Sequence, residues 1–121
     1  MKRSMMQVYI KNSDKAIQFY QDAFEAKALC DHRHENGTVA HAEIDIYGQV
    51  FAICETPEPE IAIGNTMQFC LHFGAGKEDI VRGIIEKLSG GGKLTYHGST
   101  DWSPLMAGII DRFGVNWCIF V

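Results

Sequence analysis

Apolar and polar positions follow two different periods along the chain, and these periods change in a definite order. Apolar residues alternate with polar ones over 5–11 and recur at every third or fourth position over 15–26. Strand-like segments follow over 28–34, 39–47 and 50–55. A period of two is typical of a strand, and a period near 3.6 is typical of a helix. The first half of the chain therefore predicts a strand, a helix and three further strands.

The same order of elements returns in the second half. Residues 67–73 alternate as a strand, and residues 77–88 have a helical period that places Ile80, Ile84 and Leu88 on the inward face. The remaining predicted elements are strands, at 93–97, 106–112 and 115–121. The second half therefore repeats the strand, helix and three strands of the first.

One ten-residue pattern occurs once in each half. Residues 44–53 and residues 110–119 both read Ile-Asp-x-aromatic-Gly-x-x-aromatic-x-Ile. A repeat at about half the chain length is typical of one structural unit that is used twice. We therefore expect two similar modules.

The length of the chain limits how these modules are stabilised. A chain of 121 residues has enough apolar surface for one core, and half of it is too short to be stable alone. We expect a single domain over 1–121, with module 1 at about 5–55 and module 2 at about 67–121. A linker at 56–66, rich in proline and glutamate at its start, separates the two modules.

The predicted strands have two different faces. One face is strongly apolar and must lie under the helices, since the apolar stripes of the helices need a partner. The opposite face combines polar, aromatic and thiol side chains: Gln7, Tyr9, His41, Glu43, Ala52, Cys54, Gln68, Cys70, His72, Cys118 and Phe120. Such a surface packs poorly but suits a small-molecule cup. We expect this face to line a cavity that the two modules share.

Charge and composition exclude several classes of protein. The net charge is −4, and no cluster of basic residues occurs beyond Lys2 and Arg3, so we expect no nucleic-acid partner. No apolar run is long enough to cross a bilayer, and the first ten residues lack a secretory signal. We therefore expect a cytoplasmic protein without a membrane partner, whose four cysteines are free thiols.

Four segments carry a resemblance to a known family. Residues 7–14 (Gln-Val-Tyr-Ile-Lys-Asn-Ser-Asp) and 16–24 (Ala-Ile-Gln-Phe-Tyr-Gln-Asp-Ala-Phe) are similar to an opening strand and an "FYxxaF" helix. Residues 39–44 (Val-Ala-His-Ala-Glu-Ile) are similar to an "HaeL" strand, and residues 111–119 to a closing "DpfGhxW" hairpin. Together they resemble the vicinal-oxygen-chelate superfamily of glyoxalases, extradiol dioxygenases and bleomycin-resistance proteins, in particular its PhnB-like branch.

The resemblance implies a fold and a place for a metal. The implied fold is α+β, with two βαβββ modules that form an eight-stranded, cup-shaped mixed sheet with helices on the outer face, usually in a homodimer. Enzymes of the superfamily hold a divalent metal on four inward side chains, which correspond here to Gln7, Ala52, Gln68 and Cys118. Family sites supply His or Gln from the opening strands and Glu from the closing ones, and this chain lacks both carboxylates. A divalent metal is therefore a candidate cofactor without a complete set of ligands, although Cys118 could bind zinc.

Two pairs of polar residues are candidates for the site. Gln7 and Gln68 appear at equivalent places in the two modules. They either orient a ligand or form hydrogen bonds with each other or with the backbone in the interior. His41 and Glu43 are two residues apart on one strand, so they face the same way at about 7 Å. They are the candidate catalytic residues, because they could move a proton or join Gln7 in a displaced metal site. The alternative is a hydrogen-bonded structural pair.

The thiols and one loop aromatic complete the candidates. Cys54, Cys70 and Cys118 are either buried inert thiols or, where His72 is close to Cys70, reactive ones. Trp102 lies in a loop, where it could cover a ligand or pack against a second subunit.

We expect a protein of the PhnB-like, glyoxalase and bleomycin-resistance type that binds a small organic molecule in its cup. The expected ligand-binding residues are Gln7, Tyr9, His41, Glu43, Gln68, Cys70, His72, Trp102 and Cys118. Two alternatives remain open: a metal-dependent lyase or isomerase of glyoxalase type, and a non-catalytic scaffold with a filled core.

Overall fold

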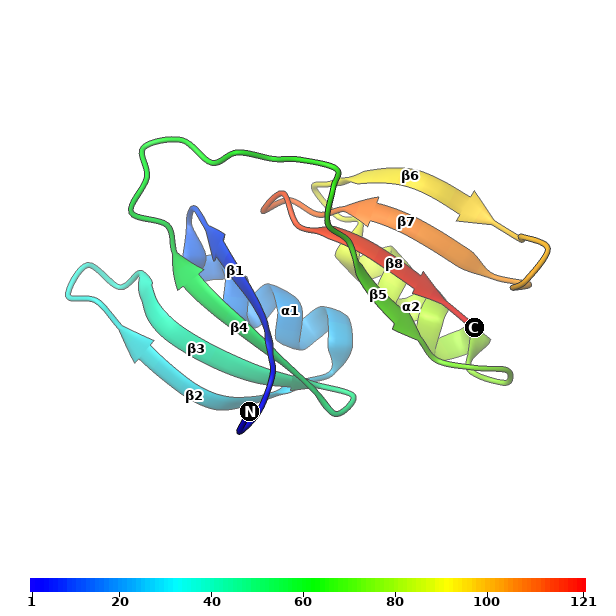
Figure 1. The fold of residues 1–121 in the computed structure, drawn as a ribbon, viewed down its shortest axis with the longest axis horizontal. Coiled ribbons are helices and arrows are strands. Elements are labelled where there is room, and N and C mark those ends of the chain that lie inside the picture. Colours follow the sequence, from blue (N-terminus) through cyan, green and yellow to red (C-terminus); the bar gives the residue numbers. More distant parts are fainter. The chain divides into compact units, whose positions relative to one another are not determined.

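The computed structural model describes all residues, 1–121, and is drawn in Figure 1. The chain divides into two compact units, Met1–Ala62 and Ile63–Val121. Each unit has the order strand, α-helix, strand, strand, strand. This order confirms the α+β class and the two βαβββ modules expected from the sequence. Neither α-helix is long and apolar enough to span a membrane.

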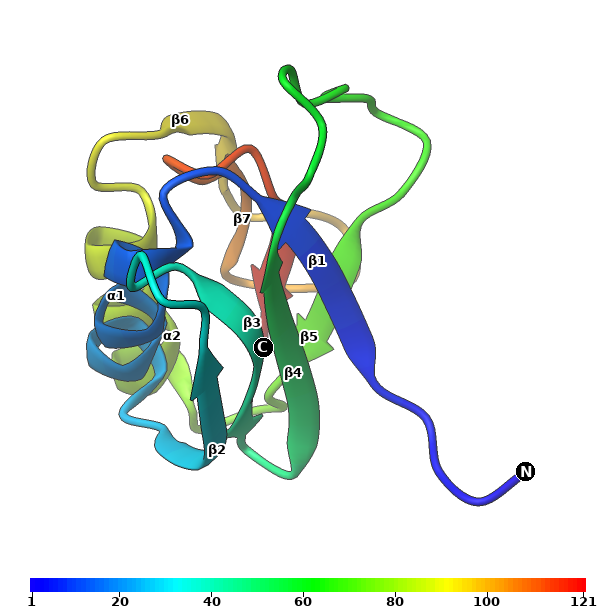
Figure 2. The same cartoon turned by 90° about the vertical axis from the view of Figure 1, so that its left-hand side faces the viewer.

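The first unit is a four-stranded mixed sheet with one α-helix. Its elements are β1 (Met6–Ile10), the short 3-10 helix η1 (Ser13–Lys15), α1 (Ala16–Phe24), β2 (Lys27–Arg33), β3 (Val39–Ile46) and β4 (Gln49–Glu55). The strand order is β1-β4-β3-β2, in which β1 runs parallel to β4 and the other neighbours are antiparallel. Seen from the side, α1 lies on one side of this sheet, and the N-terminal segment ahead of β1 leaves on the other (Figure 2).

The second unit repeats this topology. Its elements are β5 (Phe69–His72), α2 (Glu78–Leu88), β6 (Lys93–Gly98), β7 (Met106–Ile110) and β8 (Asn116–Phe120). The strand order is β5-β8-β7-β6, with β5 parallel to β8 and the other neighbours antiparallel. Each unit therefore has a parallel pair at one edge and an antiparallel hairpin at its centre.

Large apolar side chains of the first unit meet between α1 and the sheet. Tyr20 of α1 is fully buried, and its ring lies edge-on to that of Phe51 of β4, with 4.9 Å between the ring centroids. Burial of a side chain of this size stabilises a fold by about 1.5–3 kcal/mol. Because successive residues of a strand face opposite sides, Phe51 and Ile53 face the helix, and Ala52 and Cys54 face away from it.

The core of the second unit lies under α2. The buried residues of this helix are Val81, Ile84, Ile85 and Leu88. On the sheet, Trp117 and Ile119 are fully buried. The prediction that Ile80 faces inward is wrong, since 37% of this residue is exposed. The buried positions follow the spacing i, i+3, i+4, i+7 from Val81, and this stripe leaves Ile80 on the solvent side.

The two copies of the repeated pattern form hairpins with different turns. In the β3–β4 hairpin, Ile46 pairs with Gln49, and the two residues between them have positive φ, 55° at Tyr47 and 92° at Gly48. Positive φ at both central positions is the requirement of a type I′ turn, the usual two-residue hairpin connection. The Asp45 carboxylate accepts a hydrogen bond of 2.7 Å from the Gly48 N–H.

In the β7–β8 hairpin the equivalent aspartate, Asp111, directly precedes the turn. The Asp111 N–H donates to the Val115 carbonyl, which leaves three residues in the turn, and Gly114 has a φ of 88°. The extra residue shifts the pairing between the two strands. In the first unit Glu43 pairs with Ala52, whereas in the second unit Gly108 pairs with Cys118.

Candidate functional site

Strand pairing brings polar side chains of the first unit into two adjacent rows on the side of the sheet away from α1. The first row crosses the sheet as Gln7, Ala52, Glu43 and Cys30. The second row crosses it as Tyr9, Cys54, His41 and His32. We call these two rows the polar face of the first unit. They bring together the predicted residues Gln7, Tyr9, His41 and Glu43.

Glu43 is the centre of the charged contacts on the polar face. Its side chain is buried, and both of its oxygens accept hydrogen bonds from the Arg3 guanidinium, at 2.9 and 2.8 Å. The His41 Nε2 lies 3.0 Å from the Glu43 Oε1. The hydrogen bond from Arg3, and after it the one from His41, lowers the pKa of Glu43 to about 2. Glu43 is therefore a carboxylate at neutral pH and a weak proton acceptor.

His41 connects Glu43 to a buried thiol. Its Nδ1 lies 3.7 Å from the Cys54 Sγ, on the opposite side of the ring from the contact with Glu43. Burial raises the pKa of the Cys54 thiol, so Cys54 is protonated at neutral pH. The imidazole therefore lies between a carboxylate and a protonated thiol. Glu43 holds the ring in place, as the carboxylate does in many acid–base pairs.

Gln7 and Tyr9 form the exposed edge of the polar face. Both lie on the edge strand β1, and the Gln7 Nε2 donates a hydrogen bond of 3.1 Å to the Tyr9 hydroxyl. The alternative, in which Gln7 is buried and makes its hydrogen bonds inside the protein, is wrong for this residue because its side chain is exposed. Gln7 and Tyr9 are thus accessible to a ligand.

Sequence reasoning missed two residues of the polar face, Arg3 and Cys30. Arg3 precedes β1 and belongs to no regular element, so no period or motif indicates its contact with Glu43. Cys30 pairs with Glu43 across β2 and β3, and the ligand atoms of Cys30, His41 and Glu43 lie within 4.8 Å of one another. The predicted strands could have suggested Cys30, but only with their register known.

In the second unit, the face away from the buried Trp117 and Ile119 carries two neighbouring thiols. Cys70 of β5 and Cys118 of β8 are direct partners in the parallel pair. Cys70 is exposed and Cys118 is buried. Burial, with a smaller effect from the hydrogen bond with Cys70, raises the pKa of Cys118 to about 11. Cys118 is thus an unreactive thiol at neutral pH.

Three aromatic side chains meet on the same face of the second unit. The His72 ring stacks on Phe120 with 4.4 Å between centroids and 11° between planes. Trp102 meets the same phenyl ring edge-on at 5.0 Å and is 61% exposed. The Trp102 loop is closed by hydrogen bonds between Thr100 and Ser103. We call His72, Trp102 and Phe120 the aromatic group.

The predicted equivalence of Gln7 and Gln68 is wrong. Gln7 pairs with Ala52, and the residue that pairs with Cys118 is Cys70. Because Ala52 and Cys118 are matched by the repeat, Cys70 takes the place of Gln7 in the second unit. Gln68 precedes β5, and its Nε2 donates to the Asn116 Oδ1 at 3.2 Å and to the Trp117 carbonyl at 3.3 Å.

The two faces therefore differ in chemistry although the topology is the same. The positions of Glu43 and His41 are taken in the second unit by Gly108 and Met106, which pair with Cys118 and Phe120. The charged and acid–base groups lie on the first unit, and the aromatic group lies on the second.

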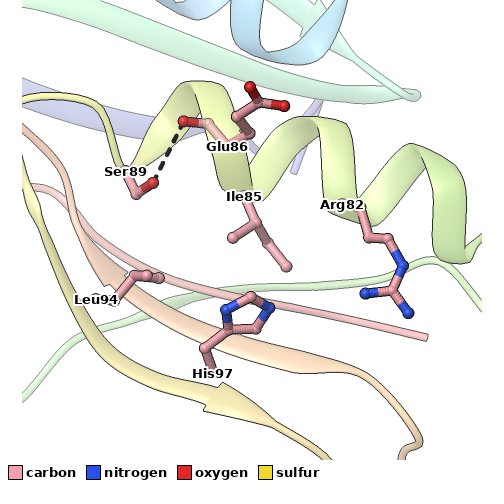
Figure 3. A pocket seen from close by; sticks show the side chains of 6 residues that line it. All are labelled: Arg82, Ile85, Glu86, Ser89, Leu94 and His97. Carbon is pink, nitrogen blue, oxygen red and sulfur yellow. Dashed lines mark hydrogen bonds between the residues drawn. The ribbon is translucent and has the colours of Figure 1, made fainter.

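Two open hollows lie beside the helices and contain none of the predicted site residues. One, of about 350 Å³, is lined by α2 and β6 through Arg82, Ile85, Glu86, Ser89, Leu94 and His97 (Figure 3). The other, of about 380 Å³, is lined by Phe24, Glu25, Lys27, Leu29, Asp45 and Tyr47. In the first hollow the Ser89 hydroxyl donates a hydrogen bond to the Glu86 carbonyl at the C-terminal end of α2 (Figure 3).

Solved structures with the same fold come from several bacteria. A PhnB protein from Bacillus cereus matches with a TM-score of 0.83 and 19% identity, over 98% of both chains. Protein PA1353 from Pseudomonas aeruginosa matches with a TM-score of 0.79 and 14% identity, over 99% of this chain and 97% of the other. A variant of the fosfomycin resistance protein FosX from Listeria monocytogenes, complexed with Mn(II) and 1S,2S-dihydroxypropylphosphonic acid, matches with a TM-score of 0.71 and 12% identity, over 98% and 90%.

These identities are low, so the structural matches show the fold alone. No curated protein matches the sequence. The sequence profile of one family matches residues 3–119, nearly the whole chain. The resemblance found in the opening, central and closing motifs is confirmed: the chain belongs to the glyoxalase/bleomycin resistance protein/dioxygenase superfamily.

Proposed function

We propose that the protein binds a small, planar organic molecule, with a ring of the ligand packed against the aromatic group of the second unit. The observation that carries this proposal is the exposed Trp102, held edge-on to Phe120, which in turn stacks on His72. An aromatic surface held in place before binding loses little conformational entropy when a ring packs on it. The FosX structure supports a small organic ligand, since that protein is complexed with 1S,2S-dihydroxypropylphosphonic acid.

Polar side chains near the aromatic group can fix the orientation of the ligand. Gln68 and Cys70 are exposed on the same edge of the sheet as His72. Ligand sites typically combine an apolar surface with a few polar groups that provide specificity. On the first unit, Gln7, Tyr9 and His41 also reach the surface, and we assign them the binding of polar ligand groups on that unit.

The test is a screen of planar aromatic fragments at millimolar concentration, followed by ¹H–¹⁵N NMR on the whole chain. We expect fragments that shift the amide signals of His72, Trp102 and Phe120, and we expect Trp102→Ala to abolish these shifts. Tyr47→Ala is the matched control, since Tyr47 is a similarly exposed aromatic residue in the β3–β4 turn. A screen without binders, or binders that ignore the Trp102 substitution, overturns the proposal and favours a non-catalytic scaffold.

A second copy of the chain could cover Trp102 instead of a ligand, as in the homodimer that the family resemblance implies. Analytical ultracentrifugation separates the two outcomes. A dimer that dissociates in Trp102→Ala assigns the aromatic group to an interface between copies and overturns the ligand proposal. Unchanged sedimentation of Trp102→Ala, together with its loss of fragment binding, supports the ligand proposal.

A metal-dependent lyase or isomerase is the second candidate function. The metal positions implied by the family do not fit a hard dication: Ala52 has no donor atom, and the amide oxygen of Gln7 carries no charge. The observation that keeps this candidate is the group of Cys30, His41 and Glu43, in which Glu43 is the cross-strand partner of the family position Ala52. Its test is metal binding by those residues.

A further inference from the structure

We propose that Cys30, His41 and Glu43 form a zinc site on the polar face of the first unit, at a place distinct from the family metal position. Cys30 and Glu43 are cross-strand partners, and His41 lies two residues from Glu43 on the same face of β3. The site does not depend on ligand binding by the aromatic group. Because all three residues lie within one unit, it is complete in the folded first unit.

The spacing of the donor atoms fits a tetrahedral zinc ion. Bonds of about 2.0–2.3 Å to N, O and S place two ligands of such an ion roughly 3.4–3.6 Å apart. Here the His41 Nε2 and the Glu43 Oε1 are 3.0 Å apart, and the three ligand atoms lie within 4.8 Å of one another. Rotation of side chains alone can therefore close the site, since the Cys30 and His41 side chains are only partly buried.

The kinds of donor atom select the metal. A thiolate and an imidazole favour zinc over Mg²⁺ and Mn²⁺, which prefer sites made of oxygen. Three protein ligands leave one tetrahedral position for an outside ligand, as in catalytic rather than structural zinc sites. The contact between the His41 Nδ1 and the Cys54 Sγ, at 3.7 Å, holds the ring so that Nε2 points at Glu43. Such outer contacts orient metal-bound histidines.

Arg3 is the natural competitor of the metal. Its guanidinium occupies both oxygens of Glu43, but its own side chain is 54% exposed and lies ahead of β1. An ion pair that is exposed on one side is weak, so a dication can replace it. Release of Arg3 frees the N-terminal segment without breaking any strand pairing.

The experiment uses Co²⁺ as a probe on whole chain that has been treated with a chelator and dialysed. Co²⁺ bound to a thiolate gives a charge-transfer band in the near ultraviolet, and Zn²⁺ should remove the band by competition. We expect one equivalent to bind in the wild type and no band in Cys30→Ser. Glu43→Gln should weaken binding by at least the roughly 10- to 100-fold that loss of an outer contact costs.

Two further variants make the test specific. Arg3→Gln removes the competing cation and should tighten Zn²⁺ binding by about two- to fivefold, the worth of an exposed ion pair. Cys70→Ser is the matched control, since it removes an exposed thiol from the second unit. Circular dichroism checks that each variant is folded.

Three results would overturn the zinc site: no band in the wild type, a band that survives Cys30→Ser, or a band that disappears in Cys70→Ser. The last outcome assigns the metal to the thiol pair Cys70 and Cys118. Fragment binding by the aromatic group is measured separately in Cys30→Ser. The zinc site and the proposed ligand binding can therefore fail independently.

Discussion

We predict that two equivalent substitutions in the repeat, Asp111→Ala and Asp45→Ala, lower the free energy of unfolding by very different amounts. Asp111 is 3% exposed, and its Oδ1 accepts hydrogen bonds from the Phe113 N–H at 2.9 Å and the Val115 N–H at 3.1 Å. Its Oδ2 accepts one from the Trp117 indole N–H at 2.9 Å. Asp45 is exposed and accepts a single bond from a turn N–H.

The expected cost follows from the donors that lose their acceptor. Asp111→Ala removes the acceptor of three buried donors, at about 1–1.5 kcal/mol each, so we expect a loss of about 3–5 kcal/mol in the free energy of unfolding. Water can replace the carboxylate of Asp45, so Asp45→Ala should cost no more than about 1 kcal/mol. A difference of about 2–4 kcal/mol is a substantial fraction of the typical total stability of about 5–15 kcal/mol.

The first unit also suggests how to separate the contribution of the indole. The repeat places Phe51, whose side chain has no N–H group, at the position of Trp117. In Trp117→Phe the indole donor is absent, so a subsequent Asp111→Ala should cost about 1 kcal/mol less than it does in the wild type. This coupling distinguishes a lost hydrogen bond from general damage to the turn.

Urea unfolding followed by circular dichroism measures these differences. The comparison requires that the slope of the unfolding free energy against urea concentration is the same in all variants. If Asp111→Ala and Asp45→Ala lie within about 1 kcal/mol of each other, the carboxylate of Asp111 does not organise the closing hairpin. The stability of an Asp111→Asn variant should fall between those of Asp45→Ala and Asp111→Ala. Its amide oxygen can accept from the backbone N–H groups, but its NH₂ group faces the Trp117 indole N–H, which is also a donor.

Two further predictions concern a thiol and a pair of glycines. In alkylation followed by mass spectrometry, Cys118 should react at least about 100-fold more slowly than Cys70 at neutral pH, since the thiolate is the reactive form and the pKa of Cys118 is raised to about 11. The Cys118 rate should keep rising until the pH approaches 11, and equal rates at neutral pH would contradict its burial. Gly92→Ala should destabilise the protein by about 1–3 kcal/mol, because a Cβ there would overlap the Ile110 carbonyl oxygen. Gly83→Ala in α2 meets no neighbour and should stabilise the protein by about 0.5–1 kcal/mol. Urea unfolding measures both changes.

The element order could be predicted from the sequence because each element has its own period. The β3 strand, for example, alternates so regularly that His41 and Glu43 were placed on one face, and their side chains do meet at 3.0 Å. The repeat likewise indicated a hairpin in each half, and both hairpins are present. These features are local, so residues close together in sequence determine them.

Register and long-range contacts could not be predicted in this way. The residue that takes the place of Gln7 depends on the register of the parallel pair β5–β8, in which Cys70 and not Gln68 lies opposite Cys118. In the β7–β8 hairpin, a turn that is one residue longer likewise changes every cross-strand partner. Arg3 reaches Glu43 across 40 residues of sequence, from a segment without any period. Such contacts follow from the folded sheet, not from the pattern of the segment itself.

In the proposed function, the protein meets its ligand on the sheet face of the second unit that lies away from the buried core. A crystal structure of the whole chain with the tightest-binding aromatic fragment tests this claim most directly. We predict that the ring of the fragment lies against His72, Trp102 and Phe120. A fragment bound instead in the hollow between α2 and β6, with the aromatic group unchanged, would contradict it.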